Sequence, residues 1–135
     1  MGKLISETLG RRWLTIPIKA SEHEAAVCET LSPLAAHPHV SDHKGLIAET
    51  WKREQEESTC IGNGIAFPHA RCEAVDQLVI AAGVHREGIH FAGVQTPIHL
   101  IFCIGTPQRL ATEYLAAVGA LARLLKDDSL RKKLL

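Results

Sequence analysis

Residues 62 to 71 read GNGIAFPHAR, a glycine turn followed by a short apolar run and a histidine directly behind a proline. Proline fixes its own φ, lacks a backbone N–H and pushes the preceding residue into an extended conformation. We therefore expect a strand over 64–67 that ends at Phe67, with His69 displayed just beyond it. By itself a Pro-His pair is weakly specific, and closing a turn is the more common reason for one.

The flanking sequence predicts helices and strands in an order typical of an α/β protein. Ser21 and Glu24 form a capping box ahead of apolar residues at helical spacing, and Ser41 or Asp42 can cap a second helix. Strands are predicted over 13–18, 64–67, 77–85 and 97–105, and helices over 21–36, 41–57, 110–126 and 129–135. Because these elements do not alternate strictly, they indicate an α/β sandwich around a mixed sheet.

Length and composition restrict the classes of protein that the chain can be. Its 135 residues fit a single domain, 1–135, and its 15 lysines and arginines balance its 15 aspartates and glutamates. That balance gives no electrostatic reason to expect a nucleic-acid partner. The four cysteines form no C-x-x-C pair, the N-terminus lacks the order of a signal peptide, and the apolar stretches are far shorter than a membrane span. We expect a cytoplasmic protein without stable membrane insertion.

His69 is the leading candidate for chemistry. A neutral imidazole is a good nucleophile near pH 7, and its labile bond to phosphorus suits a group that must be passed on. Such a site needs a hydrogen bond to the other ring nitrogen, backbone N–H groups for the phosphoryl oxygens and a nearby cation. Gly62 and Gly64 can supply the N–H groups, and Arg53 or Arg71 the cation.

Other chemistries have weaker support in the sequence. Two groups of possible metal ligands, Cys60 with His69 and Cys72, and His37 with His39 and His43, have no standard spacing, so no metal or other cofactor is expected. No nucleotide-binding fingerprint or nucleophile elbow occurs. The carboxylates at 54, 56 and 57 lie in one charged run, which we interpret as a solvated helix end.

The longer pattern resembles a known family. Arg53-Glu54, Ser58-Thr59, the two glycines, the apolar trio and Pro68-His69, in this order and spacing, are similar to the signature of the enzyme IIA domains of the fructose, mannitol and nitrogen-regulatory branch of the bacterial phosphoenolpyruvate-dependent phosphotransferase system. The similarity continues through 89–91, 96–102 and the leucine-rich helix after Pro107. It implies a three-layer α/β/α sandwich with a mixed central sheet.

The resemblance also implies a role for individual residues. His69 would accept a phosphoryl group from the phosphohistidine of the carrier protein HPr, with Arg53 stabilising it through a fork of donors. Ser58, Thr59, Gly62 and Gly64 would form the phosphate loop.

One position departs from the family pattern. Members commonly carry a second histidine at the start of the long C-terminal helix, and this sequence has Tyr114 there. A phenol donates a hydrogen bond but does not become a cation near pH 7, so the substitution bears on the efficiency of transfer. His99, at the start of a predicted strand, is a second candidate for the missing imidazole, although a strand-end residue needs no such role.

Three functions are compatible with this resemblance. The first is a separate nitrogen-regulatory IIA that signals to a target protein by its phosphorylation state. The second is a sugar-specific IIA that passes the phosphoryl group to a separate IIB, and the third is a non-catalytic binding module with the same fold. The compact motif at residues 58–71 favours the regulatory function.

Overall fold

The computed structural model describes residues 13–56 and 59–125, and within them six strands form one mixed sheet. The strands are β1 (Leu14–Thr15), β2 (Cys60–Gly62), β3 (Ile65–Ala66), β4 (His69–Arg71), β5 (Val79–Ile89) and β6 (Ile98–Thr106). The helices are α2 (His23–Leu31), α3 (His43–Glu56) and α4 (Ala111–Leu124), with short 3₁₀ helices η2 (Ser32–Ala36) and η3 (Gln108–Leu110). The order in the sheet is β1-β5-β6-β3-β2, and β4 also pairs with β6.

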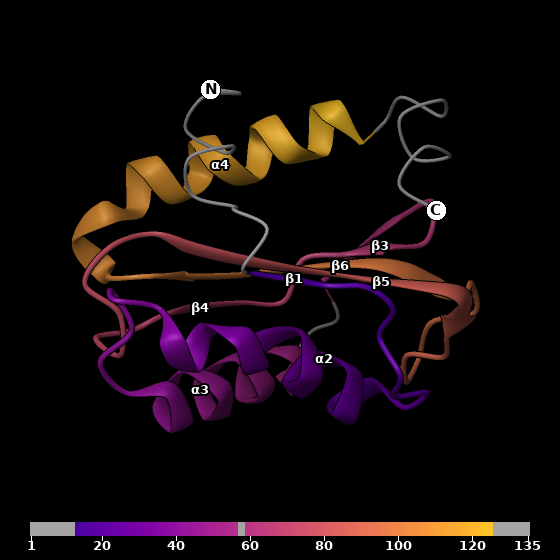
Figure 1. Cartoon of the computed structure of the whole chain (residues 1–135). Helices are drawn as coiled ribbons and strands as arrows, with labels where there is room; N and C mark the ends of the chain where they lie inside the picture. The colour runs from indigo at the N-terminus through magenta and orange to yellow at the C-terminus, as the bar shows by residue number, and fades with distance from the viewer. Residues whose placement is uncertain (1–12, 57–58, 126–135) are drawn as a thin grey trace.

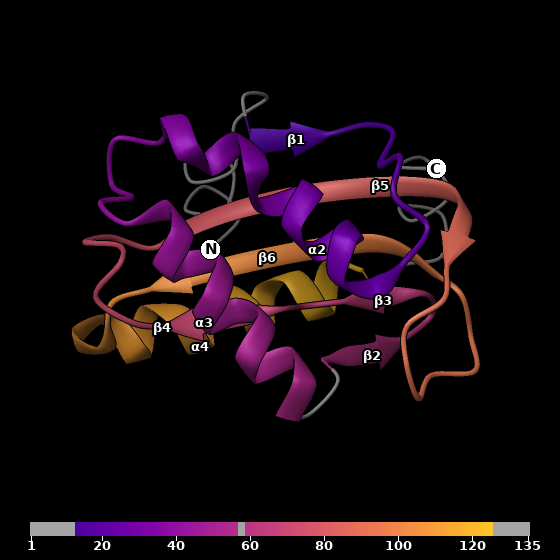
Figure 2. The same ribbon diagram turned by 90° about the horizontal axis from the view of Figure 1, so that it is seen from below.

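Helices cover both faces of the sheet. Figure 1 shows α2 and α3 on one side and α4 on the other, and Figure 2 shows the sheet from the side of α2 and α3. The side chains of β5 divide between two hydrophobic clusters, because successive residues of a strand point to opposite faces. Val79 and Ala81 pack with α2 and α3, whereas Ile80 and Ala82 pack with α4. The predicted three-layer α/β/α sandwich with a mixed sheet is confirmed.

The central strand β6 positions the segment that contains His69. β5 pairs with β6 in antiparallel fashion, while β3 and β4 both pair with it in parallel, one after the other along the same edge. Between them Pro68 has no N–H to donate, but its carbonyl oxygen accepts the N–H of Ile104 at 2.9 Å. His69 is therefore the first residue of a short strand, paired with Ile104, and not a loop residue beyond the last one.

The start of the first helix differs from the prediction. It begins at His23 after Glu22, which is extended and makes no side-chain capping bond, so the capping box predicted from Ser21 and Glu24 is wrong. The backbone of Glu22 forms a bridge with His90 instead. The second helix begins as predicted: Asp42 caps it, accepting the N–H of Gly45 at 3.0 Å.

Other helix and strand boundaries also differ from the predicted ones. The predicted helix over 21–36 tightens into η2 at Ser32, where Pro33 lies in the first turn and cannot donate an α-helical hydrogen bond. β1 has two residues instead of the six predicted over 13–18, and β5 continues past His85 through an irregular register to Ile89. The predicted helix over 129–135 lies outside the described residues.

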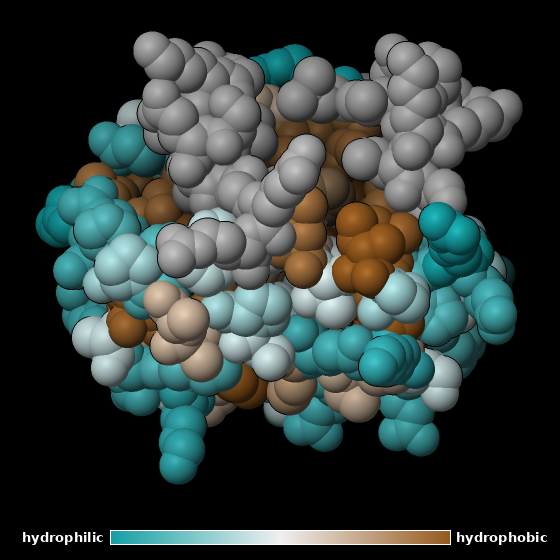
Figure 3. Space-filling view, in the orientation of Figure 1, coloured by the Kyte–Doolittle hydropathy of each residue, from teal (hydrophilic) through white to brown (hydrophobic). Residues whose placement is uncertain are grey.

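The outer surface differs between the two helical layers. Figure 3 shows mainly hydrophilic atoms over α2 and α3, and hydrophobic atoms toward the side of the sheet that bears α4. Leu115 of α4 is 65% exposed. No helix in the described part of the chain has the length and apolar character needed to cross a bilayer.

Candidate functional site

His69 lies at the amino end of β4 with its imidazole half-buried and held by a backbone contact. Its Nδ1 is 3.0 Å from the carbonyl oxygen of Phe67. A carbonyl only accepts, so Nδ1 carries the hydrogen and donates it. In the neutral ring this leaves the lone pair on Nε2, the nitrogen that can act as a nucleophile. Phe67 is the residue before the proline, and the extended conformation that proline imposes on it lets its carbonyl meet the ring two residues later.

Tyr114 stands beside this imidazole. It belongs to the first turn of α4, and its ring centroid is 5.5 Å from that of His69 at an interplanar angle of 43°. Burial raises the pKa of the phenol above its usual value, and the positive charges of Arg71 and Arg53 only partly oppose that rise. The hydroxyl is therefore neutral near pH 7 and able to donate a hydrogen bond.

Two guanidinium groups place positive charge near Tyr114. Arg53 lies in the last turn of α3 and Arg71 ends β4, and both side chains are exposed. Both lower the pKa of Tyr114 by their charge. Positive charge from α3 and β4 thus acts on Tyr114, whose ring stands beside the imidazole of His69. Such a combination suits an anionic group.

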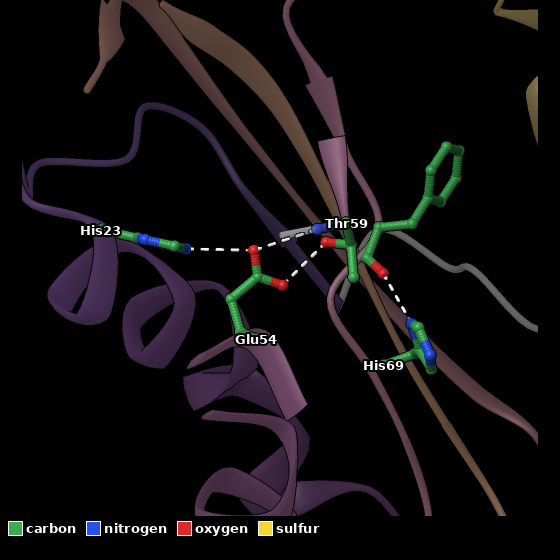
Figure 4. A network of polar contacts seen from close by, with 5 residues as sticks. His23, Glu54, Thr59 and His69 are labelled. Carbon is green, nitrogen blue, oxygen red and sulfur yellow. Dashed lines mark hydrogen bonds and ion pairs between the residues drawn. The ribbon is translucent and has the colours of Figure 1, made fainter. Parts of the chain in front are cut away.

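The buried carboxylate of Glu54 contacts Thr59 and His23, as Figure 4 shows. Glu54 is 3% exposed. Its Oε2 accepts the hydroxyl of Thr59 at 2.8 Å, and its Oε1 lies 3.1 Å from Nε2 of His23. The interpretation of residues 52 to 57 as wholly solvated is therefore wrong at Glu54. The signal was present in the sequence, because Leu46, Thr50 and Glu54 recur every four residues and form the buried face of α3.

The residues predicted to form the phosphate loop occupy different places. The hydroxyl of Thr59 is bonded to Glu54, and its carbonyl oxygen accepts the N–H of Phe67 at 3.2 Å. Ser58 lies outside the described residues. Gly62 and Gly64, with φ of +94° and +75°, form with Asn63 the turn between β2 and β3.

This glycine turn is not beside His69. The carbonyl of Gly64 accepts the N–H groups of His99 and Leu100, whereas His69 pairs with Ile104. Ile104 lies four positions beyond Leu100 along β6, or about 13 Å at the rise of a β-strand. Gly62 and Gly64 therefore shape the hairpin, and their N–H groups are not placed to meet a phosphoryl group on His69.

His99 is remote from the imidazole for the same reason. Its Nδ1 lies 3.0 Å from the carbonyl oxygen of His85, at the opposite end of β6 from the pairing of His69 with Ile104. His99 thus has only the structural role of a residue near the end of a strand. His99 is therefore not placed to supply a second imidazole beside His69.

The candidate metal ligands are not gathered into a site. Within residues 13–56 and 59–125, no three or more histidine, cysteine, aspartate or glutamate side chains lie close enough together to hold a metal ion. Cys60 and Cys72 pack against the hydrophobic cluster under α2 and α3 instead.

Comparisons with known proteins identify the family that the sequence resembles. The model of the family described as "Phosphoenolpyruvate-dependent sugar phosphotransferase system, EIIA 2" matches residues 8–135. The fructose-specific EIIABC component of Bacillus subtilis is 30% identical over 132 residues, which make up 97% of this chain but only 21% of that protein.

Solved structures give the same result. The nitrogen regulatory protein IIA-Ntr of Neisseria meningitidis superposes with a TM-score of 0.87 at 27% identity, covering 97% of this chain and 90% of that one. The mannitol enzyme IIA of Escherichia coli, in a complex with phosphorylated enzyme IIB, shares the fold with a TM-score of 0.79 at 22% identity, covering 93% and 86% of the two chains. The chain belongs to the EIIA 2 family of the phosphoenolpyruvate-dependent sugar phosphotransferase system.

Proposed function

We propose that His69 accepts a phosphoryl group from the phosphohistidine of an HPr-like carrier protein in the cytoplasm. The observation that carries this proposal is the bond from Nδ1–H of His69 to the carbonyl of Phe67, which leaves the lone pair on Nε2. That lone pair forms the new bond to phosphorus as the phosphorus–nitrogen bond of the donor breaks, and the departing donor nitrogen keeps the bonding electron pair. Nδ1 keeps its hydrogen, and the Phe67 carbonyl stabilises the positive charge that spreads over the ring.

The surroundings of His69 support the transfer of an anionic group. Arg53 and Arg71 supply positive charge on the side of Tyr114, and an arginine fork matches the oxygens of a phosphoryl group. Tyr114 supplies a neutral hydroxyl donor. Its place in the first turn of α4 also brings the amino end of a helix close to the imidazole, and Leu110 at the N-cap makes no side-chain capping bond there. The partial positive charge at the amino end of a helix favours an anion.

We propose further that the phosphorylation state of His69 regulates a target protein. The similarity to the nitrogen regulatory protein of Neisseria meningitidis, which extends over nearly the whole of both chains, supports this use. A sugar-specific role, with transfer onward to an enzyme IIB, is the second candidate. The fructose-specific relative supports it, and the related mannitol enzyme IIA has been solved with its phosphorylated IIB.

The proposal is tested by incubating the protein with phosphoenolpyruvate, enzyme I and HPr and measuring its intact mass. We expect one acid-labile phosphoryl adduct on the native chain and none on the His69→Ala variant. A native chain that stays unmodified, under conditions that phosphorylate another enzyme IIA, would refute phosphoryl transfer and leave a binding module. Rapid loss of the adduct to a fructose- or mannitol-specific IIB would favour the sugar-specific role over regulation.

A further inference from the structure

Glu54 has an unusual set of partners for a side chain in a charged run. Its side chain is fully buried, and buried carboxylates are costly unless donors surround them. Oε1 faces Nε2 of His23 at 3.1 Å and the N–H of Thr59 at 3.4 Å, while Oε2 accepts the Thr59 hydroxyl at 2.8 Å. All three contacts are donors to an acceptor-only group. The carboxylate therefore joins the start of α2 to the segment that leads into β2.

His23 is held firmly enough to act as an anchor for this carboxylate. Its ring stacks on Phe91 with centroids 3.8 Å apart and planes 17° from parallel, and Trp51 meets it edge-on at 4.9 Å. The neighbouring bridge between Glu22 and His90 ties the same end of α2 to the segment after β5. The His23 side chain is only 11% exposed. Because Nε2 faces a carboxylate, this nitrogen carries a hydrogen and donates it.

A continuous set of hydrogen bonds leads from this pair to the nucleophile. Glu54 fixes Thr59 through both its hydroxyl and its N–H, and the carbonyl of Thr59 accepts the N–H of Phe67. The carbonyl of Phe67 then accepts Nδ1–H of His69. Figure 4 shows the carboxylate and the imidazole on either side of Thr59. The carbonyl that selects the tautomer of His69 thus belongs to Phe67, whose N–H is bonded to the residue that Glu54 holds.

We infer that His23 and Glu54 are positioning residues for the imidazole of His69, an inference that rests on the proposed phosphoryl transfer. Neither side chain contacts the reacting atoms. Together they hold Thr59 and Phe67 so that the lone pair stays on Nε2 and points in one direction. The same bonds in a purely structural role would contribute to stability without affecting His69.

Three variants separate the hydrogen bond from the packing. His23→Phe keeps an aromatic ring between Phe91 and Trp51 but removes the donor. His23→Gln keeps an N–H donor and gives up the ring. Glu54→Gln replaces the carboxylate with an amide that cannot accept at both positions. The matched control is His39→Phe, because His39 pairs with Asp76 at 2.8 Å in an exposed ion pair that has no contact with this path.

The first measurement does not depend on phosphorylation. Amide hydrogen exchange at Thr59 and Phe67 reports the two bonds directly, and the ring ¹⁵N shifts of His69 report its tautomer. We expect His23→Phe and Glu54→Gln to speed exchange at both amides by about tenfold or more and to mix the two tautomers of His69. His23→Gln and His39→Phe should stay close to the native chain.

The second measurement is the rate of phosphorylation by phosphorylated HPr. We expect kcat to fall about tenfold in His23→Phe and Glu54→Gln while the KM for HPr is unchanged, because the Glu54 side chain is buried and that of His23 is only 11% exposed, so they offer a carrier almost no surface. His23→Gln should recover most of the rate. Lower stability in His23→Phe and Glu54→Gln, with native exchange at Thr59 and Phe67 and a native His69 tautomer, would overturn the inference. If the native chain itself is not phosphorylated, the proposed function fails, and exchange and tautomer alone decide the inference.

Discussion

Replacing Tyr114 by phenylalanine removes one hydroxyl beside His69 and leaves the ring in place. Tyr114 is 9% exposed and its ring centroid lies 5.5 Å from that of the imidazole, so the Tyr114→Phe variant keeps its core contacts and should lose less than about 1 kcal/mol of stability. Burial keeps the pKa of the phenol above its usual value, so it stays protonated and able to donate a hydrogen bond throughout the neutral range. The phosphoryl group that arrives next to it is an anion.

The size of the effect follows from that charge. A hydrogen bond to a charged group contributes about 1.5–3 kcal/mol, which corresponds to a roughly 10- to 150-fold slower transfer when it is lost. Rapid-quench measurement of phosphorylation by phosphorylated HPr, with a thermal melt as the control for folding, checks the prediction. Tyr114→His should transfer at least as fast as the native chain, because an imidazole also donates. A Tyr114→Phe rate within about twofold of native would refute a role for the hydroxyl.

Three other predictions concern the rest of the site and the core. Arg53→Lys should slow phosphorylation severalfold and leave the melting temperature unchanged, because the side chain is exposed and loses its fork of donors; a native rate would contradict this. Gly64→Ala should lower the free energy of unfolding in urea by about 1–2 kcal/mol, and by more than Gly62→Ala does. Both glycines have positive φ, but only at Gly64 would the new Cβ meet neighbours, the Pro97 carbonyl and His99, at 3.1 Å. Equal losses would count against that geometry. Burial raises the pKa of the Cys103 thiol well above the 9.0 of an ordinary thiol, so the folded state disfavours the thiolate. Stability should then fall as pH rises above about 9, and Cys103→Ala should flatten this part of the urea-denaturation pH profile; an unchanged profile would contradict the assignment.

The sequence was sufficient for the elements with strong local signals. The apolar runs of β5 and β6 and the amphipathic pattern of α4 predicted their positions, and Pro68 predicted the break between β3 and β4, although β3 ends at Ala66 and not at Phe67. The resemblance named His69 and Arg53 and pointed to Tyr114 as a departure; in the structure the rings of Tyr114 and His69 are neighbours, and the charge of Arg53 acts on Tyr114.

The remaining features depend on pairing between distant segments. β4 is too short to show a periodic sequence pattern of its own. It forms because His69 pairs with Ile104 of β6. The cap at Ser21 is not formed because the adjacent backbone at Glu22 bridges to His90. The glycines of GNG lie near His69 in sequence, but the parallel register carries them toward the other end of β6. Glu54 is buried only because α2 and the segment before β2 bring donors to it.

Identifying which ring nitrogen of His69 carries the phosphoryl group is the most direct test of the proposed chemistry. Phosphorylated, ¹⁵N-labelled protein is examined by NMR for coupling of phosphorus to the two ring nitrogens. The Nδ1–H bond to Phe67 predicts attachment at Nε2, with Nδ1 still protonated. Attachment at Nδ1, or a phosphoryl group on any residue other than His69, would contradict it.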